Sequence, residues 1–378
     1  MLGTMQPELI ARLTRWVERT DLPDFMTRLG IWILCNQTAR TLAGQGATGE
    51  KVFVAAMSAH PIAEHADTAN TQHYELPAQF FALTLGPRRK YSACFYKGAS
   101  ATLAEAEDAA LAATLKRAGL VDGQDILELG CGWGSLSLYM AEHFPTARIT
   151  AVSNSASQRA YIEEIARARG FSNLRVVTAD MNDFVSETPF DRIVSVEMFE
   201  HMANWDVLLG RAQGWLRPDG RLFVHIFTHA TTSYRFDYRN PAEWIAQHFF
   251  TGGLMPAEKL LWRFPQHFTI EEQWRWSGRH YARTARDWLA NYDRNIVEIR
   301  AILKTVYGTD APLWERRWRL FYLATAGLFG HSGGTIWSVS HYLLKPAGPL
   351  KLVQADSNFP LASSSTKSSP PSIANHAP

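Results

Sequence analysis

The sequence predicts an α/β fold in which helices cover both faces of a mostly parallel sheet. Short apolar runs alternate with helical patterns over residues 125–227, as in consecutive βαβ units. The first of these runs, 125–129, leads directly into a glycine turn and then into a helical segment. The chain has 378 residues, of which 46% are hydrophobic and 20% charged, so it is large enough for one such domain with additions.

The elements of this fold can be assigned in chain order. Residues 6–60 show helical periodicity, and the apolar residues of the first helix share one face: Leu9, Ile10, Leu13, Trp16 and Val17. We expect this face to pack on the rest of the protein rather than on a membrane, because nearby acidic residues dilute its basic character. A capping box, Thr102 with Glu105, predicts a helix that ends near residue 116. The other predicted helices are 135–144, 158–169, 207–216 and 319–329, and the other strands are 148–152, 174–179, 192–196, 221–227 and 336–345.

Composition excludes several classes of protein. A net charge of +2 without a long basic block argues against nucleic-acid binding. The three cysteines lack the spacing of a metal site and are odd in number, so we expect reduced thiols, no bound metal and a cytoplasmic location. Acidic residues in the first helix argue against a signal peptide, and the apolar stretch nearest the N-terminus is far too short to span a membrane.

The glycine turn distinguishes between two kinds of nucleotide ligand. Gly130, Gly132 and Gly134 follow the first strand, and Glu128 stands two residues before them. A dinucleotide site has the spacing G-x-G-x-x-G, which differs from this one, and an acidic residue here would repel a pyrophosphate. A ligand with an amino group and a sulfonium, S-adenosylmethionine, suits the carboxylate. The alternative is a turn that only packs a helix on a strand.

Polar residues also follow the second and third strands. Asn154 comes directly after the second strand, with Gln158 one helical turn later, and an asparagine amide can bond a ribose hydroxyl. Asp180 and Met181 follow the third strand, where a carboxylate could accept from the adenine amino group and a methionine could pack on the ring. Asp180 could instead only cap a turn.

The fourth strand ends in three titratable residues, Glu197, Glu200 and His201. Such groups after a buried strand are unfavourable unless they are solvated, paired or used. The spacing E-x-x-E-H without a second histidine matches a metal site poorly. General acid–base chemistry fits better, because a protonated amine must lose its proton before it can attack a methyl group. A solvent-exposed loop cap is the remaining alternative, and His225 on the fifth strand is a secondary candidate.

With these segments in place, the chain resembles the coclaurine N-methyltransferase group within the cyclopropane-fatty-acid synthase type of S-adenosylmethionine enzymes. The resemblance covers residues 72–345. It rests on these motifs: His73 to Pro77, Tyr91-Ser92, Leu129 to Ser135, Asn154 with Gln158, Asp180, Met198 to His201, and Phe249 to Gly253. It implies the class I methyltransferase fold, which is Rossmann-like with a mostly parallel seven-stranded sheet, N-terminal helices and a helical cap.

The residues and the resemblance together give a set of expected site residues. The expected cofactor-binding residues are Tyr91, Ser92, Glu128, Gly130, Gly132, Gly134, Asn154, Gln158, Asp180, Met181 and Val196. The expected catalytic residues are Glu197, Glu200 and His201, and the expected substrate contacts are Glu75, His225 and Phe250. The expected organisation is an N-terminal helical region that contributes to the site (1–98), a cofactor-binding core (99–228), a mainly helical cap (229–318), a closing helix and strand (319–345) and a disordered Ser/Pro-rich tail (346–378).

Departures from the family pattern help to choose between its two branches. Cyclopropane synthases hold a bicarbonate base with a cysteine where this chain has Ala93, and with residues that match Glu200 and His225. Another cysteine that they often carry corresponds to Thr325. The bicarbonate site is therefore incomplete, whereas Glu197 resembles the N-methyltransferase branch.

The expected function is methyl transfer from S-adenosylmethionine to the amine nitrogen of a small, aromatic, benzylisoquinoline-like molecule. One alternative is methyl transfer to unsaturated phospholipid acyl chains, which is the only reading that implies membrane association. Another is a cofactor-binding protein without catalysis. The sequence leaves the substrate open, and a homodimer is one option for the oligomeric state.

Overall fold

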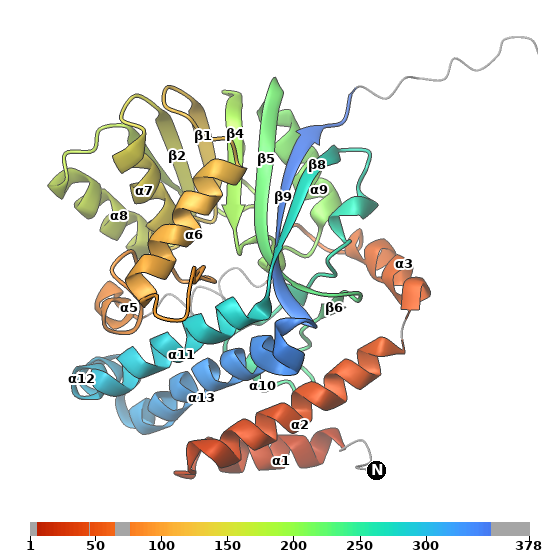
Figure 1. Cartoon of the computed structure of the whole chain (residues 1–378), viewed down its shortest axis with the longest axis vertical. Coiled ribbons are helices and arrows are strands. Elements are labelled where there is room, and N and C mark those ends of the chain that lie inside the picture. Colours follow the sequence, from red (N-terminus) through yellow and green to blue (C-terminus); the bar gives the residue numbers. More distant parts are fainter. Residues whose placement is uncertain (1–5, 45, 65–75, 349–378) are drawn as a thin grey trace, which may run out of the picture. The chain divides into compact units, whose positions relative to one another are not determined.

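The computed structural model describes residues 6–44, 46–64 and 76–348. The chain divides into two units, Met1–Ala347 and Gly348–Pro378, and the elements below belong to the first. Its centre is a seven-stranded sheet of order β3-β2-β1-β4-β5-β9-β8 (Figure 1). The first five of these strands are parallel, and β9 is antiparallel to its two neighbours. The strands are β1 (Asp125–Leu129), β2 (Arg148–Ser153), β3 (Leu174–Thr178), β4 (Phe190–Val196), β5 (Leu216–His229), β8 (Phe268–Trp276) and β9 (Trp337–Pro346). The predicted α/β fold with a mostly parallel sheet is confirmed.

Helices cover both faces of the sheet. On one face α6 (Leu103–Arg117) and α7 (Ser135–His143) bury apolar residues against β1, β4 and β5, and α6 begins with the predicted Thr102 capping box. On the other face α9 (Trp205–Gly214) and α3 (Gly46–Met57) pack against the same strands. Helix α8 (Ala156–Ala168) packs on β2 and β3. Because both faces are covered, the central strands read as nearly continuous apolar runs.

The strand order places the ligand site. It reverses between β1 and β4, whose carboxyl ends lie side by side. In open α/β sheets the crevice at this point is where ligands bind, because the loops after the two strands diverge there. The glycine turn follows β1 and the Glu197 segment follows β4, so the fold brings the two predicted halves of the site together.

A second group of helices lies beside the sheet (Figure 1). It comprises α1 (Pro7–Val17), α2 (Asp24–Ala43), α5 (Ala78–Thr84), α10 (Trp244–His248), α11 (Gly278–Arg294), α12 (Ile296–Tyr307) and α13 (Ala311–Gly330). Large aromatic side chains fill the interior of this group, among them Phe80, Phe81, Trp288, Tyr292, Trp318 and Tyr322. These rings explain the concentration of tryptophans in this part of the sequence.

Residues 229–318 are largely helical, but they also form strands that were not predicted. The segment contributes strand β8 at the edge of the main sheet and a small ribbon, β6 (Tyr234–Arg235) with β7 (Leu254–Met255). Apolar residues stand at every second position of β8 except Glu272, and the pairing register with β9 shifts between Ile270 and Glu272. The closing helix α13 also begins earlier than predicted, at Ala311.

Strand β5 is longer than predicted. It begins at Leu216, so the helix before it ends at Gly214. Pro218 was expected to precede the strand, but it falls where the register of the β4–β5 pairing is irregular. A proline is tolerated there because the missing N–H removes no regular ladder bond.

Two segments at the ends of the chain also bear on the predictions. On α1, Ile10 is buried, but Leu9, Leu13 and Trp16 are 48%, 44% and 52% exposed, so the prediction that this face packs inward is wrong for these three. Of the predicted tail, Pro346 ends β9 and residues 349–378 lie outside the described residues. No helix in the described part of the chain combines the length and apolar character needed to cross a bilayer.

The contact between Gly278 and β9 yields a test of the fold. A Cβ added at Gly278 would overlap the carbonyl oxygens of Trp337 and Phe329. Backbone atoms cannot move aside cheaply, so Gly278→Ala should lower the free energy of unfolding by about 3 kcal/mol. Gly30→Ala is the control, because nothing lies within 4 Å of its added Cβ. Chemical denaturation of both variants measures the difference, and equal stability of the two would contradict the packing described.

Candidate active site

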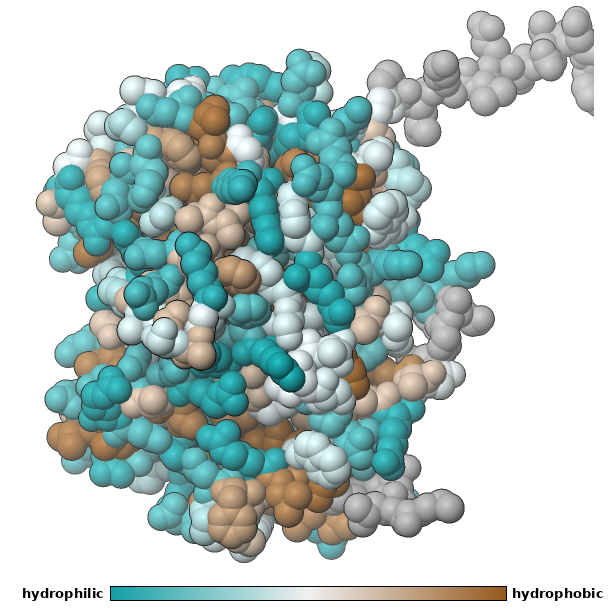
Figure 2. Space-filling model, in the orientation of Figure 1, coloured by the Kyte–Doolittle hydropathy of each residue, from teal (hydrophilic) through white to brown (hydrophobic). Residues whose placement is uncertain are grey.

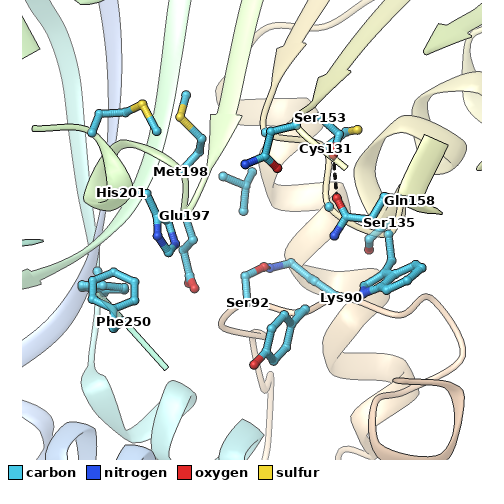
Figure 3. Close-up of a pocket in the computed structure, with 18 of the residues that line it drawn as sticks. Lys90, Ser92, Cys131, Ser135, Ser153, Gln158, Glu197, Met198, His201 and Phe250 are labelled. Atoms are coloured by element: carbon cyan, nitrogen blue, oxygen red, sulfur yellow. Dashed lines mark hydrogen bonds between the residues drawn. The ribbon is translucent and has the colours of Figure 1, made fainter. Parts of the chain in front are cut away.

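A cavity of about 250 Å³ opens at the carboxyl ends of the central strands. Figure 3 shows residues of the glycine turn and Gln158 on one side, and Glu197, His201 and Phe250 on the other. Most of the predicted site residues line it: Tyr91, Ser92, Glu128, Gly130, Gly132, Asn154, Gln158, Asp180, Met181, Val196, Glu197, His201 and Phe250. Gly134, Glu200 and His225 are not in the lining, and Glu75 lies outside the described residues.

The glycine turn after β1 needs glycine for two reasons. Gly130 has φ +80°, and a Cβ there would lie 2.5 Å from Cγ of Met198. Gly134 has φ +77° at the N-cap of α7, and its Cβ would meet Ile162 at 2.6 Å. Both positions combine a left-handed backbone with a close neighbour, which only glycine accommodates. Gly134 therefore shapes the turn without lining the cavity.

Glu128 is a buried carboxylate in the wall of the cavity. Its side chain is 2% exposed and accepts a hydrogen bond from the Ser137 hydroxyl. Burial raises the pKa of Glu128 to about 7, because the charged form loses its hydration. A cationic ligand beside this group would favour its ionised form.

The other cofactor-side residues present polar atoms to the cavity. The Ser153 hydroxyl donates to Oε1 of Gln158 over 2.7 Å (Figure 3), which leaves the buried Nε2 group of Gln158 without a partner among the described residues. The side chains of Ser135 and Trp133 hold two more such buried polar atoms. Asp180 accepts from the backbone N–H of Asn182 over 2.7 Å, so this carboxylate caps a turn while also lining the cavity.

Glu197 is held by donors from three parts of the chain. Its Oε1 accepts from the Ala93 N–H over 2.9 Å and lies 3.2 Å from Nε2 of His225, and its Oε2 accepts from the Tyr281 hydroxyl over 2.8 Å. The backbone at Glu197 has φ +48°, an uncommon conformation for a residue other than glycine. Burial raises the pKa of Glu197, while nearby Lys90 and these hydrogen bonds favour the carboxylate.

Lys90 and Tyr281 are site residues that the sequence analysis did not identify. Lys90 is buried, and its Nζ donates to the Ser92 hydroxyl over 2.5 Å and to the Ala93 carbonyl over 2.7 Å. Burial lowers the pKa of Lys90. The position of Lys90, directly before the Tyr91-Ser92 motif, was a usable signal, whereas nothing in the sequence near Tyr281 marked it.

Glu200 and His201 have different surroundings. Glu200 is fully buried behind the cavity and accepts from the Phe227 N–H over 2.7 Å, and burial together with nearby Glu197 raises its pKa well above the usual range. His201 lines the cavity, with its ring centroid 4.5 Å from that of Phe250. Burial lowers the pKa of His201 to about 4, so its imidazole is neutral at pH 7.

His225 lies behind Glu197 rather than beside the cavity. Its ring stacks on His341 with 4.4 Å between centroids, and Nδ1 of His341 lies 2.7 Å from a guanidinium nitrogen of Arg117. Arginine can only donate, so the remaining proton of neutral His341 is on Nε2. Burial lowers the pKa of His225 far below its ordinary value, and a neutral His225 can donate from Nε2 to Glu197. Its place in the structure is that of a support for Glu197.

The wall of the cavity around Glu197 and His201 is mostly aromatic. The rings come from β5, α11, α13 and the segment around β6 and α10: Phe227, Phe236, Phe250, Tyr281, Trp288, Phe321 and Phe329. Aromatic faces attract a cation, and apolar rings also exclude water from a carboxylate nearby. This half of the cavity therefore combines a negative charge with a water-poor surface.

Comparisons with known proteins agree with this geometry. Residues 63–332 match the mycolic acid cyclopropane synthetase family. The chain belongs to this family. It is 37% identical over 289 residues to (S)-coclaurine N-methyltransferase from Thalictrum flavum subsp. glaucum, an alignment that covers 75% of this chain and 80% of that protein. It is 28% identical over 270 residues to the cyclopropane-fatty-acyl-phospholipid synthase of Escherichia coli K12, covering 71% and 66% of the two chains.

Solved structures place this family member in the same group. A crystal structure of coclaurine N-methyltransferase bound to N-methylheliamine and S-adenosylhomocysteine superposes with a TM-score of 0.86 at 31% identity, covering 89% of this chain and 99% of that one. A cyclopropane synthase from Mycobacterium tuberculosis gives a TM-score of 0.64 at 25% identity, covering 75% and 98%. The protein is an S-adenosylmethionine-dependent methyltransferase with the class I fold, rather than a non-catalytic binder.

The residues of the cavity fit this cofactor. The unpartnered groups on Gln158, Ser135 and Trp133 can donate to the acceptor atoms of the nucleoside and of the amino-acid carboxylate. Glu128 offers a negative charge to the cationic groups of S-adenosylmethionine. We therefore expect the cofactor in the half of the cavity between the glycine turn and Asp180.

Glu128 gives a pH-dependent test of this placement. In the protein without ligand, the Glu128 carboxyl has a pKa of about 7, and a cationic ligand beside it should lower that pKa. The ionised form then binds more tightly, so the affinity for S-adenosylmethionine should rise by up to about tenfold between pH 6 and pH 8, with proton release. Calorimetry in buffers of different ionisation enthalpy measures both effects.

Glu128→Gln is the control for this measurement, because it keeps the shape of the side chain and leaves only the titration of the ligand itself. S-adenosylhomocysteine, which lacks the sulfonium charge, should show a weaker dependence in the wild type. Identical pH profiles for wild type and Glu128→Gln would contradict contact between this carboxylate and the cofactor.

Proposed function

We propose that the enzyme transfers a methyl group to the amine nitrogen of a small aromatic molecule of the benzylisoquinoline class. The observation that carries this proposal is the anchored Glu197 carboxylate inside an aromatic wall, next to the cofactor half of the cavity. A protonated amine would be attracted by the carboxylate and by the ring faces, each ring contributing about 0.5–2 kcal/mol. The similarity to (S)-coclaurine N-methyltransferase supports this choice of substrate. So does the similar structure of coclaurine N-methyltransferase, which contains N-methylheliamine.

The chemistry follows from the protonation of these groups. When bound, S-adenosylmethionine supplies the methyl group on its sulfonium. Glu197 holds the amine as a cation and accepts its proton, which frees the nitrogen lone pair. Neutral His201 offers a second acceptor on the same side of the cavity. The aromatic wall fixes the amine in line with the methyl group, and such positioning is a large share of the rate enhancement.

We assign Glu200 to a supporting role, although it is among the residues that the sequence predicts to be catalytic. Its carboxyl group accepts from the Phe227 N–H and does not face the cavity. This contact holds the end of β5, which carries Phe227, one of the aromatic residues that line the cavity around Glu197. The raised pKa also favours an uncharged Glu200, which cannot attract a cation.

The geometry disfavours the lipid-modifying alternative. A bicarbonate base would need hydrogen-bond donors in the part of the site that Ala93, Glu200 and His225 form. The N–H of Ala93 and Nε2 of His225 already contact Glu197. Oε1 of Glu200 accepts from the Phe227 N–H, and its buried Oε2 has no partner among the described residues. The Glu197 carboxylate thus occupies the Ala93 and His225 donors that a bound bicarbonate would require.

The reaction itself can be tested with labelled S-adenosylmethionine. The purified enzyme is incubated with a pool of secondary and tertiary aromatic amines and, separately, with vesicles of unsaturated phospholipid, and products are identified by mass spectrometry. We expect one added methyl group on an amine. A labelled acyl chain without a labelled amine would assign the enzyme to the cyclopropane branch, and no product from either pool would leave the proposal without support.

The roles of the two glutamates can be separated by a matched pair of variants. Glu197→Gln removes the charge that holds and deprotonates the amine, so kcat should fall by about 10²-fold or more. Glu200→Gln keeps an oxygen for the Phe227 N–H, so kcat should stay within about tenfold of the wild type, or ~1.4 kcal/mol. The Kd for S-adenosylmethionine is measured in parallel and should be unchanged in both. A larger loss for Glu200→Gln than for Glu197→Gln would reverse the assignment.

A further inference from the structure

The N-terminal helices carry a short sequence pattern twice. Residues 9–16 read Leu-Ile-Ala-Arg-Leu-Thr-Arg-Trp and residues 25–32 read Phe-Met-Thr-Arg-Leu-Gly-Ile-Trp. Both follow the pattern apolar-x-x-Arg-Leu-x-x-Trp, in which the apolar residue, the leucine and the tryptophan are spaced i, i+4, i+7. On a helix these three positions form one stripe, and the arginine lies at its side. We call these segments the first and second stripe.

Every defining position of both stripes is exposed. In the first, Leu9, Leu13 and Trp16 are 48%, 44% and 52% exposed, and in the second Phe25, Leu29 and Trp32 are 71%, 56% and 52% exposed. Among the described residues, half of the exposed large apolar side chains lie on α1 and α2. Figure 2 shows apolar residues gathered over these two helices. Exposed apolar side chains in such number mark a contact surface, because scattered single residues are the norm elsewhere.

Four arginines and four acidic residues lie in residues 6–32, and the arginines are the more exposed group. Arg12, Arg15, Arg19 and Arg28 are exposed. Glu18, which directly follows α1, accepts from Arg317 over 3.1 Å. Asp24 accepts from Arg319 over 2.5 Å and also lies 3.7 Å from the guanidinium of Arg28. Glu8 and Asp21 are the other acidic groups in residues 6–32. The surface thus combines leucine, phenylalanine and tryptophan with four exposed arginines.

We propose that the two stripes on α1 and α2 dock the enzyme on an anionic phospholipid surface. Helices that lie in the membrane interface carry apolar and aromatic residues on one side and arginine or lysine on the other. Tryptophan rings suit the headgroup region because they are apolar with one polar N–H. A second copy of the chain is the alternative occupant, and the oligomeric state distinguishes it from a lipid surface.

The position of α2 connects this surface to the active site. Helix α2 packs on α13 through Ile31, whose Cγ2 leaves no room for a Cβ at Gly327. The same helix α13 lines the half of the cavity around Glu197 and His201. Its lining residues are Phe321, Thr325, Leu328 and Phe329. One helix therefore separates the proposed docking surface from the place where a lipophilic amine would bind.

Vesicle flotation with the full chain tests the proposal. The wild type should float with vesicles of phosphatidylcholine and phosphatidylserine, and much less with phosphatidylcholine alone or at high salt. The variant Leu13→Glu with Leu29→Glu should lose binding by roughly tenfold or more, because both side chains would enter the acyl boundary. Val297→Glu is the matched control, because Val297 is 72% exposed on α12, and it should bind as the wild type does.

Two further measurements distinguish a lipid surface from a second copy of the chain. Hydrogen exchange of the wild type is measured with and without anionic vesicles. The vesicles should slow exchange in peptides of α1 and α2 and leave those of α12 unchanged. This measurement does not depend on the folding of any variant. Light scattering after gel filtration gives the oligomeric state. A wild-type dimer that the double variant makes monomeric, without vesicle binding by either, would assign the surface to a second copy and overturn the proposal. Equal flotation of the wild type and the double variant would also overturn it.

Discussion

The site depends on one buried carboxylate, that of Glu197, and on the groups that oppose its protonation. Burial raises the pKa of Glu197, and the charge of Lys90, the Ala93 amide and the Tyr281 hydroxyl act against that rise, while His225 lies 3.2 Å from the same carboxylate. These groups come from the segment before α6, from α11 and from β5. The helices beside the sheet therefore do more than cover the cavity, since without α11 the carboxylate would lose the hydroxyl of Tyr281.

The fold could be predicted from sequence where local patterns were regular. The parallel strands β1 to β4 are mostly apolar and their helices begin and end at recognisable residues, so these strands and their connections were predicted to within a few residues. Strand β8 was not recognised because the polar residues 271–273 interrupt its apolar alternation and its tryptophans suggested helical packing. The length of β5 was misjudged because Pro218 normally ends an element, and the irregular pairing that tolerates it is visible only in three dimensions.

In the candidate site, too, local sequence patterns predicted some residues, while others depend on three-dimensional contacts. Residues that directly follow strands, such as Asn154 and Asp180, line the cavity as the topology requires. The spacing of Glu197 and Glu200 could not reveal their different surroundings. The backbone of Glu197 has a left-handed conformation, its side chain lines the cavity, and the side chain of Glu200 lies behind it. Tyr281 lies 84 residues from its partner in the sequence, so no local pattern could connect them. The stripes on α1 and α2 were visible as helical periodicity, but whether an apolar face points inward or outward is a property of the assembled fold.

The backbone at Glu197 also limits how this site could change over evolutionary time. A residue with φ +48° is easily replaced by glycine, which adopts this conformation without strain, and only with difficulty by a β-branched residue. A glycine there would remove the carboxylate and leave the Ala93 amide, the Tyr281 hydroxyl and the His225 imidazole facing an anion-sized space. Such a variant would lose the base that the protein itself supplies, while the groups that now hold Glu197 would remain in place.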